Sequence, residues 1–460
     1  MSRPPVVVSD AGNAAVAILP NPIAHANQTY NLVSNRHTFN DVAASFSEAL
    51  GREVKYVHVP YEAAKQSLLQ IGYQDWQVDG IFELDKLIDS GSHITNQENL
   101  AHYTKITGEK PTELKTWIAS VKAAFQMVIA RKYVLKSHFQ GLPKREDLEI
   151  VEEELPPLKD GEFLTETLWL TVDPYMRPYS QFLELGTTMI GELVAKVTES
   201  KNPNYSVGEV VVANVGWRTH TIVGESILQQ SPPIVRKVDP SINLPSSTAV
   251  GILGMPGATS YYGFLKICSP KPGETLVVTG AAGAVGSAVG QIAKIKGCRV
   301  VGFAGSDDKV AYLKSIGFDE AINYKTVTSL SDALKKACPN GVDLFFDNVG
   351  GEFFEVVLSQ MNTFGRVSVC GCISQYNLEE PPKARPVSSL ILFHQLKVEG
   401  FIVLRWSFEE WSAAFKEMAQ WIQEGKLKYE ETVTEGFDKM FDAFLGLFKG
   451  ENLGKAVVKV

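Results

Sequence analysis

A glycine-rich turn is the part of the sequence best suited to carry chemistry. Gly280, Gly283 and Gly286 lie between the apolar run at residues 275–279 and the apolar run at residues 284–296. Glycines let a backbone turn tightly and approach a pyrophosphate, while the start of the following helix offers N–H groups to its charge. A glycine triplet alone is weak, but the strand and helix patterns around it favour a dinucleotide-binding turn over an ordinary loop.

The residues after the next predicted strand, 299–303, indicate which dinucleotide binds. An NAD enzyme places an acidic side chain there for the ribose 2′-hydroxyl. This chain reads Gly302-Phe-Ala-Gly-Ser-Asp-Asp-Lys309, with small residues first and a cation after them. The space and Lys309 suit a 2′-phosphate, so NADPH is favoured over NADH. Asp307 and Asp308 could instead cap the following helix.

The order of predicted elements gives the fold class. From about residue 250, predicted strands and helices alternate, with a further helix expected at 307–316 and a further strand at 342–347. This alternation is typical of a doubly wound α/β fold. Residues 127–250 instead contain short strands such as 163–170 and 209–213, separated by Pro-Pro, Asp-Gly and Val-Gly pairs. We therefore expect an α/β protein with a β-rich domain beside a Rossmann domain.

Charge and composition exclude several classes of function. The chain has 460 residues with 44 Lys+Arg and 52 Asp+Glu, a net charge of −8, and no basic block, so we expect no nucleic-acid partner. Its five cysteines include no C-x-x-C pair, which argues against disulfides and structural zinc. No apolar run approaches the ~18 residues of a membrane span. We expect a cytoplasmic protein.

Five strings extend this interpretation to a known family. They are Thr171-Val-Asp-Pro-Tyr-Met-Arg177, Leu253-Gly-Met-Pro-Gly257, Ala281-Ala-Gly-Ala-Val-Gly286, Phe346-Asp-Asn-Val-Gly-Gly351 and Asn452-Leu-Gly-Lys455. Through them, residues 127–460 resemble the zinc-independent medium-chain dehydrogenase/reductases, and among them the prostaglandin reductases, which include leukotriene 12-hydroxydehydrogenases and alkenal/one reductases. The resemblance implies a GroES-like domain at 127–252 and 403–460 and a Rossmann NADPH-binding domain at 253–402.

The family resemblance also implies a set of cofactor-binding residues. The pyrophosphate would be cradled by Gly283, Ala284, Val285 and Gly286, and the 2′-phosphate would be held by Lys309 and Tyr324. The nicotinamide would lie beside Met255 and Thr259. The rest of NADPH would be lined by Asn348, Cys370, Gly371, Cys372, Ile373, Ser374, Gln375, Tyr376, Phe401, Ile402, Val403 and Asn452. Taken singly, Asn348 could be a turn residue, 401–403 a core strand, and the two cysteines small buried side chains.

The expected chemistry follows from the ligands that the chain lacks. Residues 127–267 contain His138 and His220 but no cysteine, so we expect no metal and no zinc Lewis acid. Hydride delivery then requires a carbon already polarised by conjugation, the β-carbon of an α,β-unsaturated ketone or aldehyde, with a donor for the carbonyl oxygen.

Three tyrosines are candidates for that donor. Tyr376 is preferred, and Tyr175 and Tyr261 are the others, although a tyrosine is more often structural. Arg177 could meet a lipid carboxylate or be a surface or ion-paired residue. The chain has Phe393 where the family has a tyrosine, so the role of that hydroxyl is in doubt here, and we interpret the neighbouring His394 as a surface residue.

The N-terminal segment has a separate resemblance. Residues 8–125 are similar to the C-terminal part of NmrA-like atypical short-chain dehydrogenases, through the strings at 10–19, 29–43 and 104–112. Helices are expected at 12–19, 40–50, 76–88 and 111–125, with strands at 29–33 and 55–59. The segment lacks a glycine-rich phosphate loop, and Met127 begins a new strand pattern. We therefore expect a partial NmrA-like unit at 1–126 joined to a complete reductase.

Three functions remain in competition. The first is NADPH-dependent reduction of enones, including 15-oxo-prostaglandins and alkenals, with an enone or oxidised lipid as the partner and a homodimer left open. The second is an NADPH quinone reductase, which shares the fold, the cofactor and the absence of zinc. The third is a non-catalytic NADPH-responsive interaction protein, which would bind the cofactor without turnover.

Overall fold

The computed structural model describes residues 2–3, 14–17, 20, 37–51, 53–57, 59, 61–70, 74–89, 97–125, 128–380 and 386–460. They belong to two compact units, Met1–Met127 and Val128–Val460. Among the described helices, none combines the length and the apolar character that a membrane crossing requires.

The described part of the N-terminal unit is mainly helical. Its helices are α2 (Phe39–Leu50), α3 (Tyr61–Gln70), α4 (Asp75–Asp89), α5 (Gln97–Thr107) and α6 (Leu114–Phe125), and β1 (Ser2–Arg3) pairs with β2 (His37–Thr38). Helix α2 begins at a capping box between Thr38 and Asp41 and ends at Gly51, whose φ of 67° suits glycine. Phe46 of α2 packs edge-on against Trp117 of α6, with ring centroids 6.3 Å apart.

The sequence predictions for this unit have mixed outcomes. The helices expected at 40–50, 76–88 and 111–125 are confirmed, and residues 14–17 of the first expected helix are helical. The strand expected at 55–59 is wrong for residues 55–57 and 59, which have no regular structure. An alternating segment forms a strand only beside a partner, and no described residue pairs with it. The strand expected at 29–33 lies outside the described residues.

A six-stranded parallel sheet forms one half of the second unit. Its strand order is β12-β11-β10-β13-β14-β15, and all neighbouring pairs are parallel. The order reverses between β10 and β13. At this switch point, the carboxyl ends of the two strands flank the crevice where such sheets bind ligands. The bounds are β10 (Thr275–Val278), β11 (Arg299–Ala304), β12 (Glu320–Asn323), β13 (Val342–Asp347), β14 (Met361–Val369) and β15 (Lys397–Gly400).

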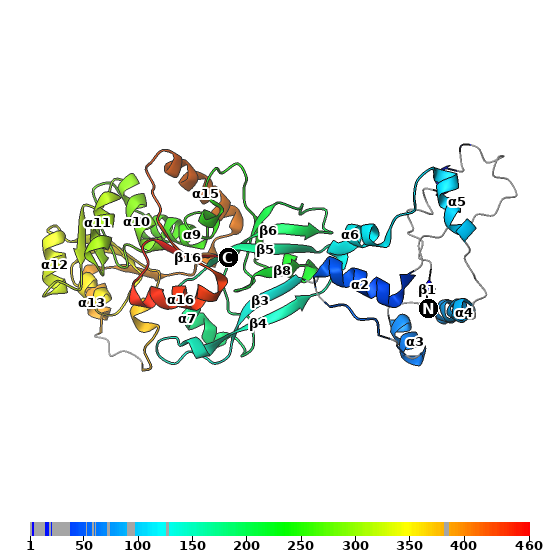
Figure 1. The fold of residues 1–460 in the computed structure, drawn as a ribbon. Helices are drawn as coiled ribbons and strands as arrows, with labels where there is room; N and C mark the ends of the chain where they lie inside the picture. The colour runs from blue at the N-terminus through cyan, green and yellow to red at the C-terminus, as the bar shows by residue number, and fades with distance from the viewer. Residues whose placement is uncertain are drawn as a thin grey trace. The chain divides into compact units, whose positions relative to one another are not determined.

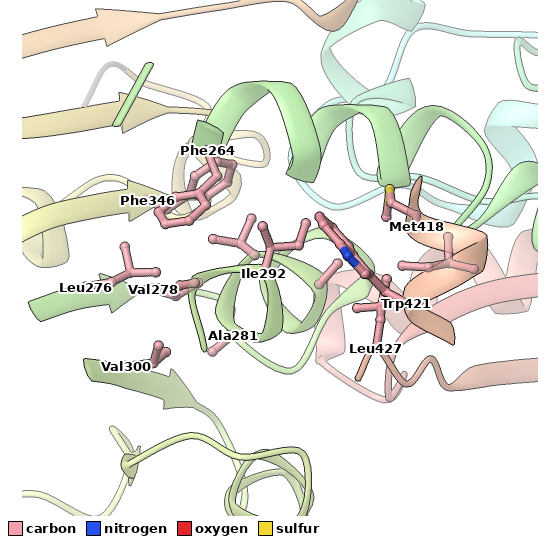
Figure 2. Close-up of a cluster of buried hydrophobic side chains, with 14 of the residues drawn as sticks. Phe264, Leu276, Val278, Ala281, Ile292, Val300, Phe346, Met418, Trp421 and Leu427 are labelled. Atoms are coloured by element: carbon pink, nitrogen blue, oxygen red, sulfur yellow. The ribbon is translucent and has the colours of Figure 1, made fainter. Parts of the chain in front are cut away.

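Helices cover both faces of this sheet because its strands are apolar on both sides. Leu276 and Val278 pack into one cluster, whereas Val277 between them packs into another. The first cluster includes α9 (Met255–Tyr262), α10 (Ala284–Ile295) and α15 (Phe408–Gln423), and Figure 2 shows Met418 and Trp421 of α15 beside Ile292 of α10. The second includes α12 (Leu330–Ala337), α13 (Glu352–Leu358) and α14 (Ser388–His394), while α11 (Asp307–Ser315) contacts β11 and β12. Figure 1 shows α10 to α13 around the parallel strands. The predicted doubly wound arrangement is confirmed.

The other half of the second unit is rich in antiparallel strands. Its seven-stranded sheet has the path β16-β17-β5-β6-β7-β9, with β8 paired to β5, and β3 pairs separately with β4. Strand β17 near the C-terminus runs antiparallel to β5, so the end of the chain returns to this sheet. Phe163, Trp217 and Phe444 are among its fully buried side chains. The bounds are β3 (Val128–Leu135), β4 (Leu148–Leu155), β5 (Phe163–Thr171), β6 (Leu193–Ser200), β7 (Val210–Ala213), β8 (His220–Val223), β9 (Val235–Lys237), β16 (Glu431–Glu435), β17 (Lys455–Lys459) and the helix α16 (Met440–Lys449).

Candidate active site

The glycine-rich turn after β10 is packed so tightly that it requires its glycines. A methyl group added at Gly286 would lie 2.5 Å from the carbonyl oxygen of Gly280, and Gly280 itself has a φ of 58°. Gly283 precedes α10, Ala284 and Val285 open it, and no described side chain caps this helix. The exposed helix start and the close backbone approach fit a dinucleotide pyrophosphate.

A buried carboxylate holds the loops at the switch point together. Asp347, at the end of β13, accepts a hydrogen bond from the Thr279 hydroxyl at 2.6 Å and others from the N–H groups of Val349 and Gly350. Burial raises the pKa of this carboxyl group. Asn348 donates its side-chain amide to the Thr279 carbonyl at 2.7 Å. Asn348 therefore holds the turn after β13 to the end of β10.

The loop 370–376 is attached to this switch point. The N–H groups of Cys370 and Gly371 donate to the Asp347 carbonyl, and that of Ile373 donates to the Asn348 carbonyl. The Ser374 hydroxyl donates to the Val349 carbonyl at 2.6 Å. The loop predicted to line the cofactor thus lies at the carboxyl ends of β13 and β14.

A cluster of cations surrounds the end of β11. A methyl group added at Gly305 would lie 3.2 Å from the Tyr324 hydroxyl and 3.3 Å from Cε of Lys325. Burial lowers the pKa of Lys309, and the positive charge of Lys325 lowers it further. No described carboxylate forms an ion pair with either lysine, so the cluster fits an anion such as a 2′-phosphate.

Lys309 and the acids beside it lie at the start of α11. The Lys309 ammonium donates to the Gly450 carbonyl at 2.8 Å. Ser306, rather than Asp307 or Asp308, caps α11, and the two acids lie in its first turn. The sequence analysis missed Lys325, although its position directly after Tyr324 was a usable signal.

Tyr376 lies in the wall of a cavity of about 480 Å³ between the two halves of the second unit. Its hydroxyl oxygen accepts a hydrogen bond from the Cys372 N–H at 3.3 Å, and the phenol also interacts with the Cys372 side chain. Burial raises the pKa of Tyr376 to about 12, so the phenol stays protonated at neutral pH. The lining residues are Phe139, Gln140, Gly141, Arg177, Pro178, Gln181, Phe182, Cys372, Gln375, Tyr376, Leu378 and Glu379.

Arg177 is not a surface residue, so that interpretation is corrected. Its side chain is buried, and its guanidinium donates to the carbonyls of Phe139 at 3.1 Å and Gly141 at 3.0 Å. It also lies over the Phe139 ring. No described carboxylate forms an ion pair with it. Arg177 therefore shapes the cavity wall.

The other tyrosine candidates lie away from the cavity lining. The Tyr261 hydroxyl donates to the Glu417 carboxylate, and its ring stacks on Trp421. Tyr175 packs edge-on against Tyr179, and burial raises its pKa well above the ordinary value. Of the three tyrosines, only Tyr376 lines the cavity.

The remaining predicted cofactor residues lie on α9 and in the segments after β15 and before β17. Thr259 donates its hydroxyl to the Met255 carbonyl at 2.7 Å within α9, and Asn452 donates its side-chain amide to the Gly454 carbonyl. The N–H of Gly454 in turn donates to the Ala282 carbonyl of the glycine-rich turn. Residues 401–403 form no strand, with Phe401 and Val403 packed inward and Ile402 exposed.

Two residues at the end of α14 do not line the cavity. Phe393 on α14 is 77% exposed and does not line it. His394 next to it is half-buried and ends the helix. The described residues also contain no cluster of three or more His, Cys, Asp or Glu side chains that could hold a metal ion.

Comparisons with known proteins agree with this geometry. A family model described as the N-terminal domain of oxidoreductase matches residues 131–230, and one described as zinc-binding dehydrogenase matches residues 284–424. Prostaglandin reductase 1 of Bos taurus is 53% identical over 337 residues, which cover 72% of this chain and 100% of the relative. The NADPH-dependent curcumin reductase of Escherichia coli (strain K12) is 37% identical over 342 residues, covering 72% and 96%.

A solved structure extends the comparison to the fold. CurA from Vibrio vulnificus in complex with NADPH has a TM-score of 0.65 and 36% identity, and the match covers 72% of this chain and 99% of CurA. The predicted GroES-like and Rossmann-like fold and the predicted NADPH cofactor are confirmed for residues 128–460, whereas the NmrA-like resemblance gains no support. The chain belongs to the prostaglandin reductase 1 family of medium-chain oxidoreductases, NADP-dependent enzymes that reduce the carbon–carbon double bond of enones.

Proposed function

We propose that the enone substrates of this chain are products of lipid oxidation, alkenals and oxo-lipids such as 15-oxo-prostaglandins, and that Tyr376 is the catalytic donor. The observation that carries the proposal is the position of the Tyr376 phenol, which lies in a mainly apolar cavity next to the loops at the switch point. Prostaglandin reductase 1 in several mammals is about half identical to this chain, which supports the same substrate class.

The residues of the site divide the work of the reaction. NADPH supplies the hydride that reaches the β-carbon of the enone. Phe139, Pro178 and Leu378 hold the carbon chain and exclude water. Tyr376 donates a hydrogen bond to the carbonyl oxygen as negative charge develops there, and the Cys372 N–H keeps the phenol in place. The α-carbon of the resulting enolate then takes a proton from water, which completes the reduction.

Turnover of three substrate types tests this proposal. With NADPH, we expect the full chain to reduce a long alkenal and a 15-oxo-prostaglandin faster than a quinone. Faster reduction of the quinone would favour the quinone reductase. NADPH binding without turnover of any of the three would favour the non-catalytic interaction protein.

The cations at the end of β11 give a prediction about cofactor choice. We expect Lys309→Ala to weaken NADPH binding by about tenfold and to leave NADH unchanged, because only the hydrogen bond and charge interaction with the 2′-phosphate are lost. Lys325→Ala should weaken NADPH in the same selective way. Dissociation constants for both cofactors measure this effect.

Lys314→Ala is the matched control, because Lys314 lies on the same helix α11 but pairs with Glu320. It should leave both dissociation constants unchanged. If Lys309→Ala weakens NADPH and NADH equally, the 2′-phosphate lies elsewhere.

We also propose that the reductase is complete without the N-terminal segment, with the domain boundaries that the sequence analysis gave and a partial NmrA-like unit at 1–126. The compact unit Val128–Val460 contains both halves of the fold, and the family matches lie at 131–230 and 284–424. A domain with its own core does not need a neighbour in order to fold.

A protein that begins at Met127 tests this division. We expect it to retain NADPH binding, alkenal turnover and the thermal unfolding midpoint of the full chain. Insoluble or inactive protein from residues 127–460, with an active full chain as the control, would make the N-terminal segment an integral part of the enzyme.

A further inference from the structure

Phe182 is an exposed aromatic side chain on the wall of the cavity that Tyr376 lines. It ends the short 3₁₀ turn Ser180–Phe182 and is 86% exposed, yet it belongs to the cavity lining. Leu378, two residues after Tyr376, lines the same cavity and is 48% exposed. Phe182 comes from the β-rich half and Leu378 from the Rossmann half, so each half offers the cavity an apolar surface that water reaches.

The backbone on both sides of Phe182 is tied to a neighbouring segment. The Gln181 side-chain amide donates to the Phe139 carbonyl at 3.1 Å, and a ring N–H of His138 donates to the Leu183 carbonyl at 2.9 Å. The Leu183 side chain packs against the buried cluster of the β-rich half. Phe182 therefore lies on a fixed segment, which presents its ring to the cavity while the next residue packs inward.

An exposed phenyl ring in this position suits a hydrocarbon better than a polar group. Apolar surface in contact with water gains free energy when another apolar surface covers it, in proportion to the area covered. In the proposed reaction the carbonyl oxygen of the substrate lies at Tyr376, on the Rossmann half. The apolar surface on the other half, at Phe182, is then left for the carbon chain.

We infer that Phe182 is a specificity-determining residue, which selects enones with a long apolar chain by binding that chain together with Leu378. The inference rests on the proposed function and narrows its substrate class to the longer alkenals and oxo-lipids. Each methylene group that the ring covers strengthens binding by up to about fourfold. This contact is the same in the ground state and in the transition state, so it should lower KM and leave kcat unchanged.

A series of linear alkenals of increasing length tests the inference on the full chain with saturating NADPH. The series is butenal, hexenal, nonenal and dodecenal, and we expect kcat/KM to rise along it. Phe182→Ala should lower the ratio of kcat/KM for dodecenal to that for butenal by about tenfold, through a higher KM for dodecenal. Phe182→Leu should keep most of the natural ratio, because it retains an apolar side chain of similar reach.

Leu185→Ala is the matched control, since Leu185 follows Phe182 closely in the chain, is 56% exposed and does not line the cavity. It also removes an exposed apolar side chain, and it should leave the ratio unchanged. An unchanged ratio in Phe182→Ala, or the same fall in Leu185→Ala, would overturn the inference and leave the enone reductase standing. Failure of the natural chain to reduce any of the alkenals while NADPH binds would instead overturn the proposed function, and the inference with it.

Discussion

Tyr376→Phe should lower kcat for enone reduction by about a hundredfold, because it removes the one phenol among the described residues that line the cavity. Loss of a single donor to a developing oxyanion costs about 10²–10³ in rate. The Tyr376 ring, its packing and the cofactor-binding loops remain, so NADPH affinity should stay unchanged and KM for the enone should change little. Steady-state kinetics and a cofactor titration separate these effects.

Tyr175→Phe is the matched comparison, since it removes the same hydroxyl from the other tyrosine with a predicted catalytic role. Tyr175 does not line the cavity, so its variant should keep nearly full activity. The reverse result, a large loss with Tyr175→Phe and a small one with Tyr376→Phe, would place the donor on the loop after β5.

The raised pKa of Tyr376 predicts that its ionisation does not affect activity near neutral pH. A phenol with a pKa of about 12 remains protonated throughout the neutral and mildly alkaline range. We therefore expect no loss of activity from ionisation of Tyr376 between pH 7 and pH 9.

Local sequence patterns predicted the doubly wound sheet because its signals are short-range. The strand at 275–279, the glycines after it and the helix from Ala284 each follow from a few consecutive residues. The same holds for Gly51, which ends α2 with a positive φ. Consistent local signals of this kind specify the elements and their order.

The contacts that decide the roles of single side chains were not predictable from the sequence. Arg177 donates to carbonyls 36 and 38 residues away, and Tyr261 meets Glu417 across 156 residues. Such partners depend on how the two halves of the reductase pack. Lys325 was missed although it directly follows Tyr324, because only the fold shows that it lies beside Gly305 at the end of β11.

Lys455 gives the last prediction, a large loss of stability from a single substitution. Its ammonium is buried and contacts the Asp173 carboxylate at 2.9 Å and the carbonyls of Val172 and Ala456 at 2.8 and 2.9 Å. Lys455→Met leaves the Asp173 charge buried without a partner, which costs about 3–5 kcal/mol. We expect a clear fall in the thermal and urea unfolding midpoints.

Lys459→Met provides the control on the same strand. Lys459 faces Glu435 at 3.9 Å with both side chains more than half exposed, and such surface pairs contribute little. A double variant, Lys455→Met with Asp173→Asn, should recover part of the loss, because the unpaired charge is gone. If Lys455→Met matches Lys459→Met in stability, the buried pair contributes nothing to folding.

The effect of Lys455→Met should reach the active site as well. Asp173 begins the loop that continues through Tyr175 to Arg177, and Arg177 holds the cavity wall by its hydrogen bonds to Phe139 and Gly141. Loosening Asp173 should therefore raise KM for the enone before the protein unfolds. NADPH affinity should change less, because the cations at the end of β11 lie on the Rossmann sheet.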